Sequence, residues 1–166
     1  VGDGLLLGVG RDADAKGRVT GVGVSLFDVS DPSAPRLRSR LAYPDGYTNV
    51  EGDHLAFLWW APDKLALIPE SGPDFSGLLA IGTAGELTER GRLSHPRQDD
   101  GGYSYTPEIQ RSLVAGGRLY TLGYDGLQVA SLQTLAPEGF LALAAPQTGG
   151  GGVVPQPAAV SSPAPR

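Results

Sequence analysis

Short apolar runs separated by turn residues recur along most of this chain of 166 residues. The 25 glycines and 14 prolines fall largely between the apolar runs, a distribution that favours many turns and short strands. No window keeps apolar residues at helical spacing over several turns. The pattern therefore predicts an all-β chain built from many short strands.

Three segments of the chain follow one another with the same order of strands, about 50 residues apart. A period near 50 residues with about four strands in each unit is typical of a β-propeller blade. We therefore predict a partial β-propeller of about two and three-quarter four-stranded antiparallel blades. The predicted strands are 5–9, 20–29 and 36–43 in blade 1, 54–59, 64–69, 77–82 and 86–93 in blade 2, and 110–115, 118–123, 126–132 and 139–143 in blade 3.

The composition changes near residue 145, which divides the chain into blades at 1–144 and a tail at 145–166. The tail contains Gly, Pro, Ala and Ser in quantity and no aromatic residue, so we expect it to be disordered. A linker and a frayed terminus remain equal alternatives. The first residue is Val, and blade 1 has no innermost strand. We expect the chain to be the C-terminal part of a larger propeller, whose remaining blades would cover its outer blades.

Charge and hydropathy narrow the classes of partner. The net charge is −5 and no basic stripe is present, so nucleic acid is not expected as a partner. No apolar run approaches the length of about 18 residues that a membrane span needs. There is no cysteine, hence no disulfide framework. A cation, a protein or a glycan is the expected kind of ligand.

The connections between predicted strands are unequal in length at the two ends of the blades. In an antiparallel blade, successive connections alternate between the ends. The longer connections, 10–19, 44–53, 70–76 and 94–109, fall at one end, which we call the long-loop face. Loops on a rigid scaffold commonly carry binding residues, so this face is the predicted binding face. Tolerated insertions are the alternative explanation.

The segment from Asp12 to Gly17 resembles part of a calcium-binding loop. Asp12 and Asp14 have the alternating spacing that lets carboxylates converge on a hard cation, and Gly17 permits a sharp turn. Lys16, however, places a positive charge where a third ligand belongs, and Gly23 stands where a final Glu is needed. The pair is thus a weak calcium candidate, and a solvated acidic loop is the competing interpretation. No other cofactor is expected.

Two further groups of polar residues are candidate ligand contacts. Asp53 and His54 open the predicted inner strand of blade 2, where His54 could serve as a base or ligand, or be a buried histidine that a neighbouring group satisfies. The second group lies in the long loop after blade 2 and consists of two adjacent aspartates and two tyrosines. These residue types suit sugar stacking or peptide recognition, and they equally suit an ordinary surface loop. The four are Asp99, Asp100, Tyr103 and Tyr105. His95 is expected to be a simple loop histidine, and one of Trp59 and Trp60 to pack between blades.

At RDADAKGRVTGVGVSLFDVSDPSAPRL, beginning at Arg11, the chain resembles secreted bacterial and archaeal proteins with a C-terminal β-propeller domain. The stretches 53–68 and 111–121 support the resemblance, which covers residues 5–143 and only the C-terminal blades of that domain. The resemblance implies an extracytoplasmic propeller, secreted or surface-anchored. Members often carry an acidic residue at the position of Lys16, which weakens the cation site further.

No nucleophile elbow, phosphate-binding loop, dinucleotide fingerprint or HExxH motif is present. The leading expectation is a non-catalytic extracytoplasmic binding or scaffold module that uses the long-loop face. A propeller hydrolase or lyase, with carboxylates and His54 near a central channel, is an alternative. A structural spacer of the cell envelope is another.

Overall fold

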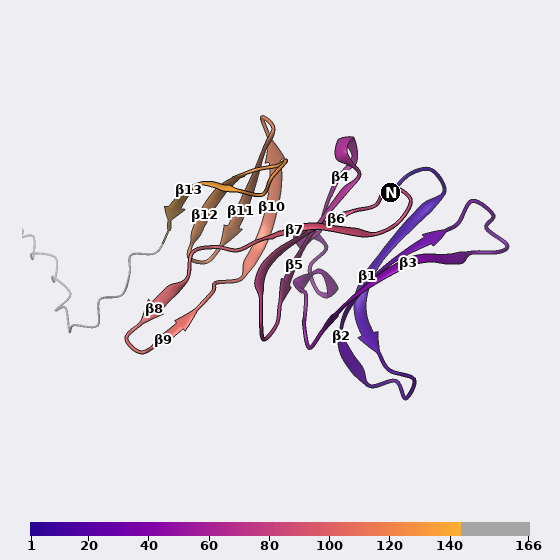
Figure 1. The fold of residues 1–166 in the computed structure, drawn as a ribbon, viewed down its shortest axis with the longest axis horizontal. Helices are drawn as coiled ribbons and strands as arrows, with labels where there is room; N and C mark the ends of the chain where they lie inside the picture. Colours follow the sequence, from indigo (N-terminus) through magenta and orange to yellow (C-terminus); the bar gives the residue numbers. More distant parts are fainter. Residues whose placement is uncertain (144–166) are drawn as a thin grey trace, which may run out of the picture.

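The computed structural model describes residues 1–143 and confirms an all-β fold of three blades side by side (Figure 1). The strands of each blade follow one another in sheet order and pair antiparallel. The predicted tail at 145–166 lies outside the described residues. Within the part that is described, no helix has the length and apolar character required to cross a bilayer.

Blade 1 has three strands, as predicted, but its first strand extends to residue 13, so the predicted long connection 10–19 is reduced to residues 14–18. The strands are β1 (Leu5–Ala13), β2 (Val19–Asp28) and β3 (Arg36–Pro44). Apolar residues alternate along β2, so Val22, Val24 and Leu26 point to one side and are buried. The opposite side of the sheet is left uncovered by the described residues.

Blade 2 has four strands, but its first strand begins later than predicted. The strands are β4 (Leu58–Trp60), β5 (Leu65–Ser71), β6 (Ser76–Gly82) and β7 (Thr88–Leu93). Residues 54–57 are therefore not in a strand, and the prediction for that stretch was wrong. The Asp53 side chain accepts a hydrogen bond from the Leu55 amide and caps a short 3-10 helix, a local bond that competes with strand pairing.

Three 3-10 helices flank β4. They are η1 (Asn49–Glu51), η2 (His54–Ala56) and η3 (Ala61–Asp63). Thr48 caps η1 through its hydroxyl oxygen. The first two helices lie in the connection from blade 1 to blade 2, and the third lies in the turn between β4 and β5.

Blade 3 has the four predicted strands. They are β10 (Ile109–Ala115), β11 (Arg118–Gly123), β12 (Gly126–Ser131) and β13 (Pro137–Ala142). The connection from blade 2 to blade 3 contains a separate two-stranded sheet, β8 (Gln98–Asp100) and β9 (Tyr103–Tyr105), that the apolar pattern does not predict.

The core consists of two apolar layers, one on each face of blade 2. Every residue of β5 is buried, because alternate side chains face blade 1 and blade 3. Trp59 packs in the layer against blade 1 and Trp60 in the layer against blade 3. The prediction of one tryptophan between blades thus underestimated their role, since adjacent residues of a strand point to opposite faces.

The outer blades present apolar side chains that the described residues do not cover. Leu113 and Leu141 on blade 3 are 53% and 61% exposed, and Leu6 and Leu37 on blade 1 are also exposed. Propellers usually close with at least about four blades. The described chain is therefore a partial propeller with two open blade faces.

Candidate binding face

The long connections gather at one end of the three blades, at the lower edge of Figure 1. Backbone hydrogen bonds of 2.8 and 3.0 Å join Tyr47, in the connection from blade 1 to blade 2, to Ser71 at the end of β5. The Gln128 amide of blade 3 donates to the carbonyl of Ser94 at 3.1 Å. These contacts tie the long-loop face together across all three blades.

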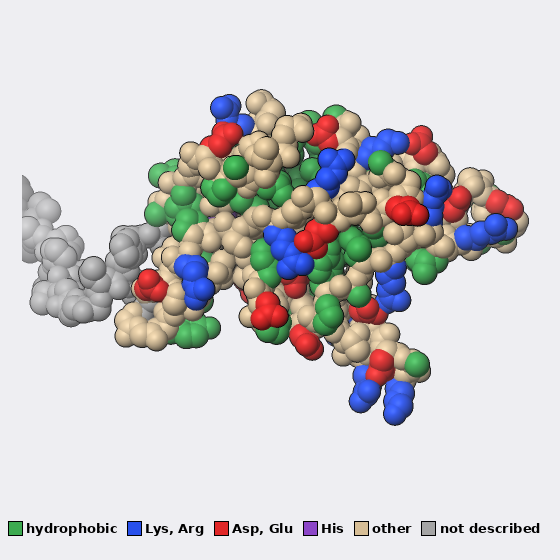
Figure 2. Space-filling view, viewed as in Figure 1, with side chains coloured by type: hydrophobic (Ala, Val, Ile, Leu, Met, Phe, Trp, Pro, Cys, Tyr) green, Lys and Arg blue, Asp and Glu red, His purple; other side chains and the backbone are tan. Residues whose placement is uncertain are grey.

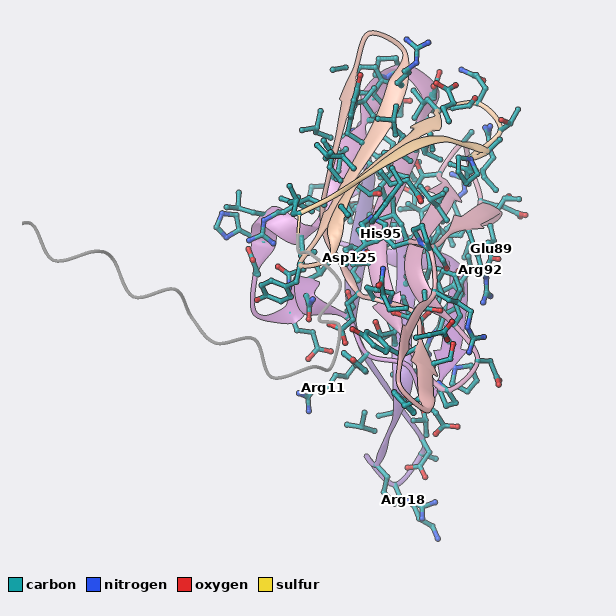
Figure 3. The ribbon with its side chains drawn as sticks, turned by 90° about the vertical axis from the view of Figure 1, so that its left-hand side faces the viewer. Arg11, Arg18, Glu89, Arg92, His95 and Asp125 are labelled. Carbon is teal, nitrogen blue, oxygen red and sulfur yellow. The ribbon has the colours of Figure 1, made fainter. Side chains whose placement is uncertain are left out.

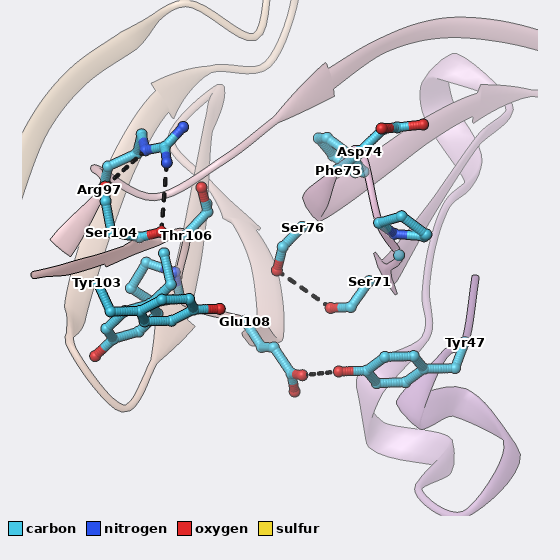
Figure 4. A pocket seen from close by; sticks show the side chains of 14 residues that line it. Tyr47, Ser71, Asp74, Phe75, Ser76, Arg97, Tyr103, Ser104, Thr106 and Glu108 are labelled. Atoms are coloured by element: carbon cyan, nitrogen blue, oxygen red, sulfur yellow. Dashed lines mark hydrogen bonds between the residues drawn. The ribbon is translucent and has the colours of Figure 1, made fainter. Parts of the chain in front are cut away.

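A cavity of about 520 Å³ opens on this face between the loops of blades 2 and 3 (Figure 4). We call it the tyrosine pocket. Its lining combines aromatic rings, hydroxyls and a few charged groups. The lining residues are Tyr47, Ser71, Gly72, Pro73, Asp74, Phe75, Ser76, Arg97, Tyr103, Ser104, Tyr105, Thr106, Pro107 and Glu108.

The β8–β9 hairpin places two aromatic rings at the margin of the tyrosine pocket. Tyr103 and Tyr105 lie two residues apart on β9 and so point to the same side. Their ring centroids are 6.0 Å apart with 16° between the planes, and both side chains are exposed. Gly101 and Gly102 have φ values of 59° and 144°, which glycine adopts readily in a tight turn. The rings form an accessible stacking platform.

Arg97, which immediately precedes β8, holds the β8–β9 hairpin in place. Its guanidinium donates to the Ser104 hydroxyl at 3.1 Å and to the Ser104 carbonyl at 3.4 Å (Figure 4). Because Ser104 lies between the two tyrosines, this contact holds β9 in position. The hairpin that carries the two tyrosines is thus stabilised by the hydrogen bonds from Arg97 as well as by the pairing of β8 with β9.

Tyr47 and Glu108 close the far side of the tyrosine pocket. The Tyr47 hydroxyl donates to the Glu108 carboxylate, and this hydrogen bond joins the connection between blades 1 and 2 to the start of blade 3. The hydrogen bond to Glu108, together with burial, raises the pKa of Tyr47. Nearby, the hydroxyl oxygens of Ser71 and Ser76 lie 3.2 Å apart. The pocket floor therefore presents several polar groups to a ligand.

The residues predicted as ligand contacts separate in space. Tyr103 and Tyr105 line the tyrosine pocket, whereas Asp53, His54 and Asp99 are outside its lining. Asp53 forms an ion pair with Arg111, and although burial opposes the shift, hydrogen bonds from Leu55 and Arg111 lower its pKa. His54 and Asp99 are exposed, and the Asp100 side chain is not described.

Asp12 and Asp14 are each engaged by an arginine. Asp12 pairs with Arg40. Asp14 accepts hydrogen bonds from the amides of Lys16 and Arg18 at 2.8 and 3.0 Å and pairs with the Arg18 side chain at 2.7 Å; the hydrogen bonds from Arg18 lower its pKa. Among the described residues, no group of three or more His, Asp or Glu side chains is placed to hold a metal ion. Calcium at Asp12 and Asp14 stays a prediction.

His95 is a buried structural histidine, so its prediction as a simple loop residue was wrong. Nδ1 lies 2.9 Å from an Asp125 carboxylate oxygen, and Nε2 lies 2.9 Å from the Thr121 hydroxyl. Figure 3 labels His95 and Asp125 close together within the blades. Both partners come from blade 3, 26 and 30 residues further along the chain, so no local pattern marks the site.

Sequence reasoning also missed several lining residues of the tyrosine pocket. Arg97, Glu108 and Phe75 carry no motif of their own, and they meet only because the connection from β7 to β10 and the connection from β5 to β6 converge. The usable signal was the length of those connections, which pointed to the end of the blades where this cavity lies. Which side chains share a cavity depends on the packing of one blade on the next.

The fold and the converging loops define an open β-propeller arc with a loop-lined cavity at one end. A family described as "Beta propeller domain" matches residues 1–135, and the chain belongs to this family. No curated protein and no solved structure gives a significant match to the chain.

Proposed function

We propose that this chain is a non-catalytic binding module that takes up a neutral glycan chain on its long-loop face. The observation that carries the proposal is the exposed, stacked pair of Tyr103 and Tyr105 at the margin of a cavity of about 520 Å³. Flat aromatic faces with nearby hydrogen-bonding groups suit ligands that have one apolar face and a polar rim. Sugar rings have that character.

The polar lining supports a neutral ligand over a strongly charged one. Three charged residues line the cavity. Arg97 donates to Ser104 and Glu108 accepts from Tyr47, so two of them already have hydrogen-bond partners, and Asp74 is the third. The remaining polar groups near the platform include the hydroxyls of Ser71, Ser76 and Thr106. On the face drawn in Figure 2, acidic and basic side chains are interspersed. A neutral, hydroxyl-rich ligand matches this arrangement.

We further propose that the module works outside the cytoplasm and beside additional blades of a longer chain. The first part rests on the resemblance to secreted propeller proteins. The second is supported by the uncovered apolar residues of the outer blades, such as Leu113 and Leu141, because large exposed apolar surfaces usually have a partner. Fractionation of the producing cell would test the location.

Saccharide binding can be tested by calorimetric titration of the chain with pentasaccharides of glucose, mannose and N-acetylglucosamine. We expect at least one to bind, and we expect the Y103A and Y105A variants to weaken that binding about fivefold, since loss of an aromatic stack is worth about 1 kcal/mol. Y124A is the matched control, because Tyr124 is 84% exposed and lies outside the tyrosine pocket.

Two results would contradict the proposed function. Saccharide binding that is equally strong in the Y103A, Y105A and Y124A variants would place the ligand elsewhere. Binding of a proline-rich decapeptide but of no saccharide, with the same sensitivity to Tyr103 and Tyr105, would keep the site and overturn the ligand class.

A further inference from the structure

A second cavity, of about 320 Å³, lies on the long-loop face between blades 1 and 2. We call it the Glu70 pocket. It meets the tyrosine pocket at the loop 72–75 between β5 and β6, which lines both cavities. The residues that decide its chemistry are Tyr43, Glu70, Asp74, Phe75, Glu89 and Arg92.

Tyr43 brings an unsatisfied hydroxyl to the wall of the Glu70 pocket. The residue is 8% exposed, and its buried hydroxyl has no hydrogen-bond partner of ordinary geometry. Burial, followed by the nearby Glu89 carboxylate, raises the pKa of Tyr43 well above its usual range, so the phenol stays neutral. Buried polar atoms are nearly always hydrogen-bonded in native proteins, so a ligand that supplies a partner to this hydroxyl beside Glu89 would remove an unfavourable contact.

Glu70 brings an acidic group to the same wall. It is 5% exposed, and the structure shows no hydrogen bond from a described residue to its carboxylate. The carboxylate fits its position because two neighbours are glycines. A side chain at Gly46 would collide with Glu70 Oε1, and one at Gly72 would come within 3.1 Å of it. The backbone thus leaves space for this group at the cavity wall.

Arg92 does not neutralise Glu70 by a direct contact. Its Nε and one terminal nitrogen donate to the two oxygens of Glu89 at 2.8 and 3.2 Å. Its guanidinium also lies 5.0 Å from the centroid of the Phe75 ring and 5.8 Å from that of Tyr43. Figure 3 shows Arg92 and Glu89 together, away from His95 and Asp125. Arg92 therefore lines the cavity, and its positive charge is already balanced by the Glu89 carboxylate.

The remaining charge of the pocket is negative. Glu70 and Asp74 have no basic partner in the lining once Glu89 and Arg92 have paired. A bare metal ion is a poor candidate, because the described residues offer no group of three acidic or histidine ligands. A polyatomic cation with several N–H donors can instead reach both Glu70 and the Tyr43 oxygen.

We propose that the Glu70 pocket binds a primary ammonium group, which donates hydrogen bonds to the Glu70 carboxylate and to the Tyr43 hydroxyl oxygen. The apolar part of the ligand lies beside Phe75 and Leu41, which also line the cavity. Two sources share this chemistry, a lysine side chain of a protein and an amino sugar of a glycan. The proposal does not depend on the glycan site at Tyr103 and Tyr105.

The test measures binding of Nα-acetyl-lysine amide and of glucosamine to the whole chain by NMR. Each has an uncharged match, Nα-acetyl-norleucine amide and N-acetylglucosamine. We expect at least one amine to bind and neither match to bind at the Glu70 pocket. Binding of the lysine compound alone indicates a protein partner, and binding of glucosamine alone indicates an amino sugar.

Two variants test the role of the wall. We expect E70Q to weaken amine binding at least tenfold and Y43F to weaken it severalfold, while Y103A leaves it unchanged. E86Q is the matched control, because Glu86 is an exposed carboxylate outside the lining of the cavity. Amine binding that survives in E70Q, or the absence of amine binding by a wild-type chain with a folded NMR spectrum, would overturn the proposal. Neither result would bear on saccharide binding at the tyrosine pocket.

Discussion

Glu70 makes the stability of the fold depend on pH in an unusual direction. Burial raises its pKa from the ordinary value of 4.5, and although Arg92 opposes the shift, Glu89 adds to it. The folded state therefore binds the proton more tightly than the unfolded state does. It follows that ionisation of Glu70 destabilises the fold above the raised pKa, and that this loss is relieved as the pH falls toward 4.5.

We predict that the E70Q variant is more stable than the wild type at pH 8, by about 1 kcal/mol. The difference should shrink as the pH falls to 5, because the wild-type carboxyl then becomes neutral. Urea unfolding at both pH values measures the effect, and the neighbouring groups Tyr43, Asp74, Glu89 and Arg92 are unchanged in both proteins. Equal stability at pH 8 would show that Glu70 is better solvated than the structure indicates.

His95 is a buried polar residue whose two ring nitrogens both have hydrogen-bond partners. Its ring is buried between Asp125 and Thr121, so replacement by Ala leaves a nearly buried carboxylate and a buried hydroxyl without partners. We predict that H95A lowers the free energy of unfolding by about 3 kcal/mol. H54A is the control, because His54 is exposed and such changes usually stay within about 0.5 kcal/mol. Denaturant titration of both variants decides between a structural and a peripheral role for His95.

At the scale of the element, a buried glycine in the third strand of blade 2 and an exposed glycine in the fourth strand of blade 3 should respond differently to replacement by alanine. A Cβ at Gly77 in β6 would collide with the Leu93 carbonyl oxygen of β7 and come within 2.8 Å of the Phe75 ring. A Cβ at Gly139 in β13 meets nothing within 4 Å. The first position needs the close approach of two strands, and the second does not.

We predict that G77A loses about 2 kcal/mol or more, because the β6–β7 pairing must shift. G139A should be neutral or slightly stabilising, since Ala reduces the freedom of the unfolded chain. Thermal unfolding of the two variants is the measurement. A similar loss in both would mean that a general requirement for glycine in these strands, rather than the contact with Leu93, sets the effect.

The strands differ in how well they can be predicted from the sequence. The alternation along Arg118–Gly123 predicts β11 with the observed bounds. The stretch after Asp53 reads as a strand, but its capping bond to Leu55 forms a 3-10 helix. The β8–β9 hairpin gives only a weak strand signal, because β8 is entirely polar, β9 has three residues, and the turn depends on Gly101 and Gly102.

The candidate site was predictable in position and only partly in composition. The long connections indicated the end of the blades where the tyrosine pocket lies, and Tyr103 and Tyr105, which line it, were named from sequence. The partner of Tyr47 is Glu108, which lies 61 residues away. The unsatisfied state of Glu70 also depends on how loops of two blades meet. Such contacts arise from packing between distant segments, and no local spacing encodes them.

At the scale of the whole molecule, the uncovered blade faces should govern the behaviour of the chain in solution. Leu113, Leu122 and Leu141 are exposed on blade 3, and Leu6 and Leu37 are exposed on blade 1. We predict that the isolated chain associates, and that the double variant L113K/L141K associates less. Sedimentation velocity at several concentrations measures this. Equal association of the variant would show that another surface is responsible.

The central claim is that the long-loop face carries ligand binding, and NMR shift mapping of the whole chain with its bound saccharide tests it most directly. We predict the largest backbone shifts at residues 71–76 and 97–108, next to Tyr103 and Tyr105, with little change at the opposite turns such as 116–117. Shifts centred on those opposite turns, or on the open faces of the outer blades, would contradict it.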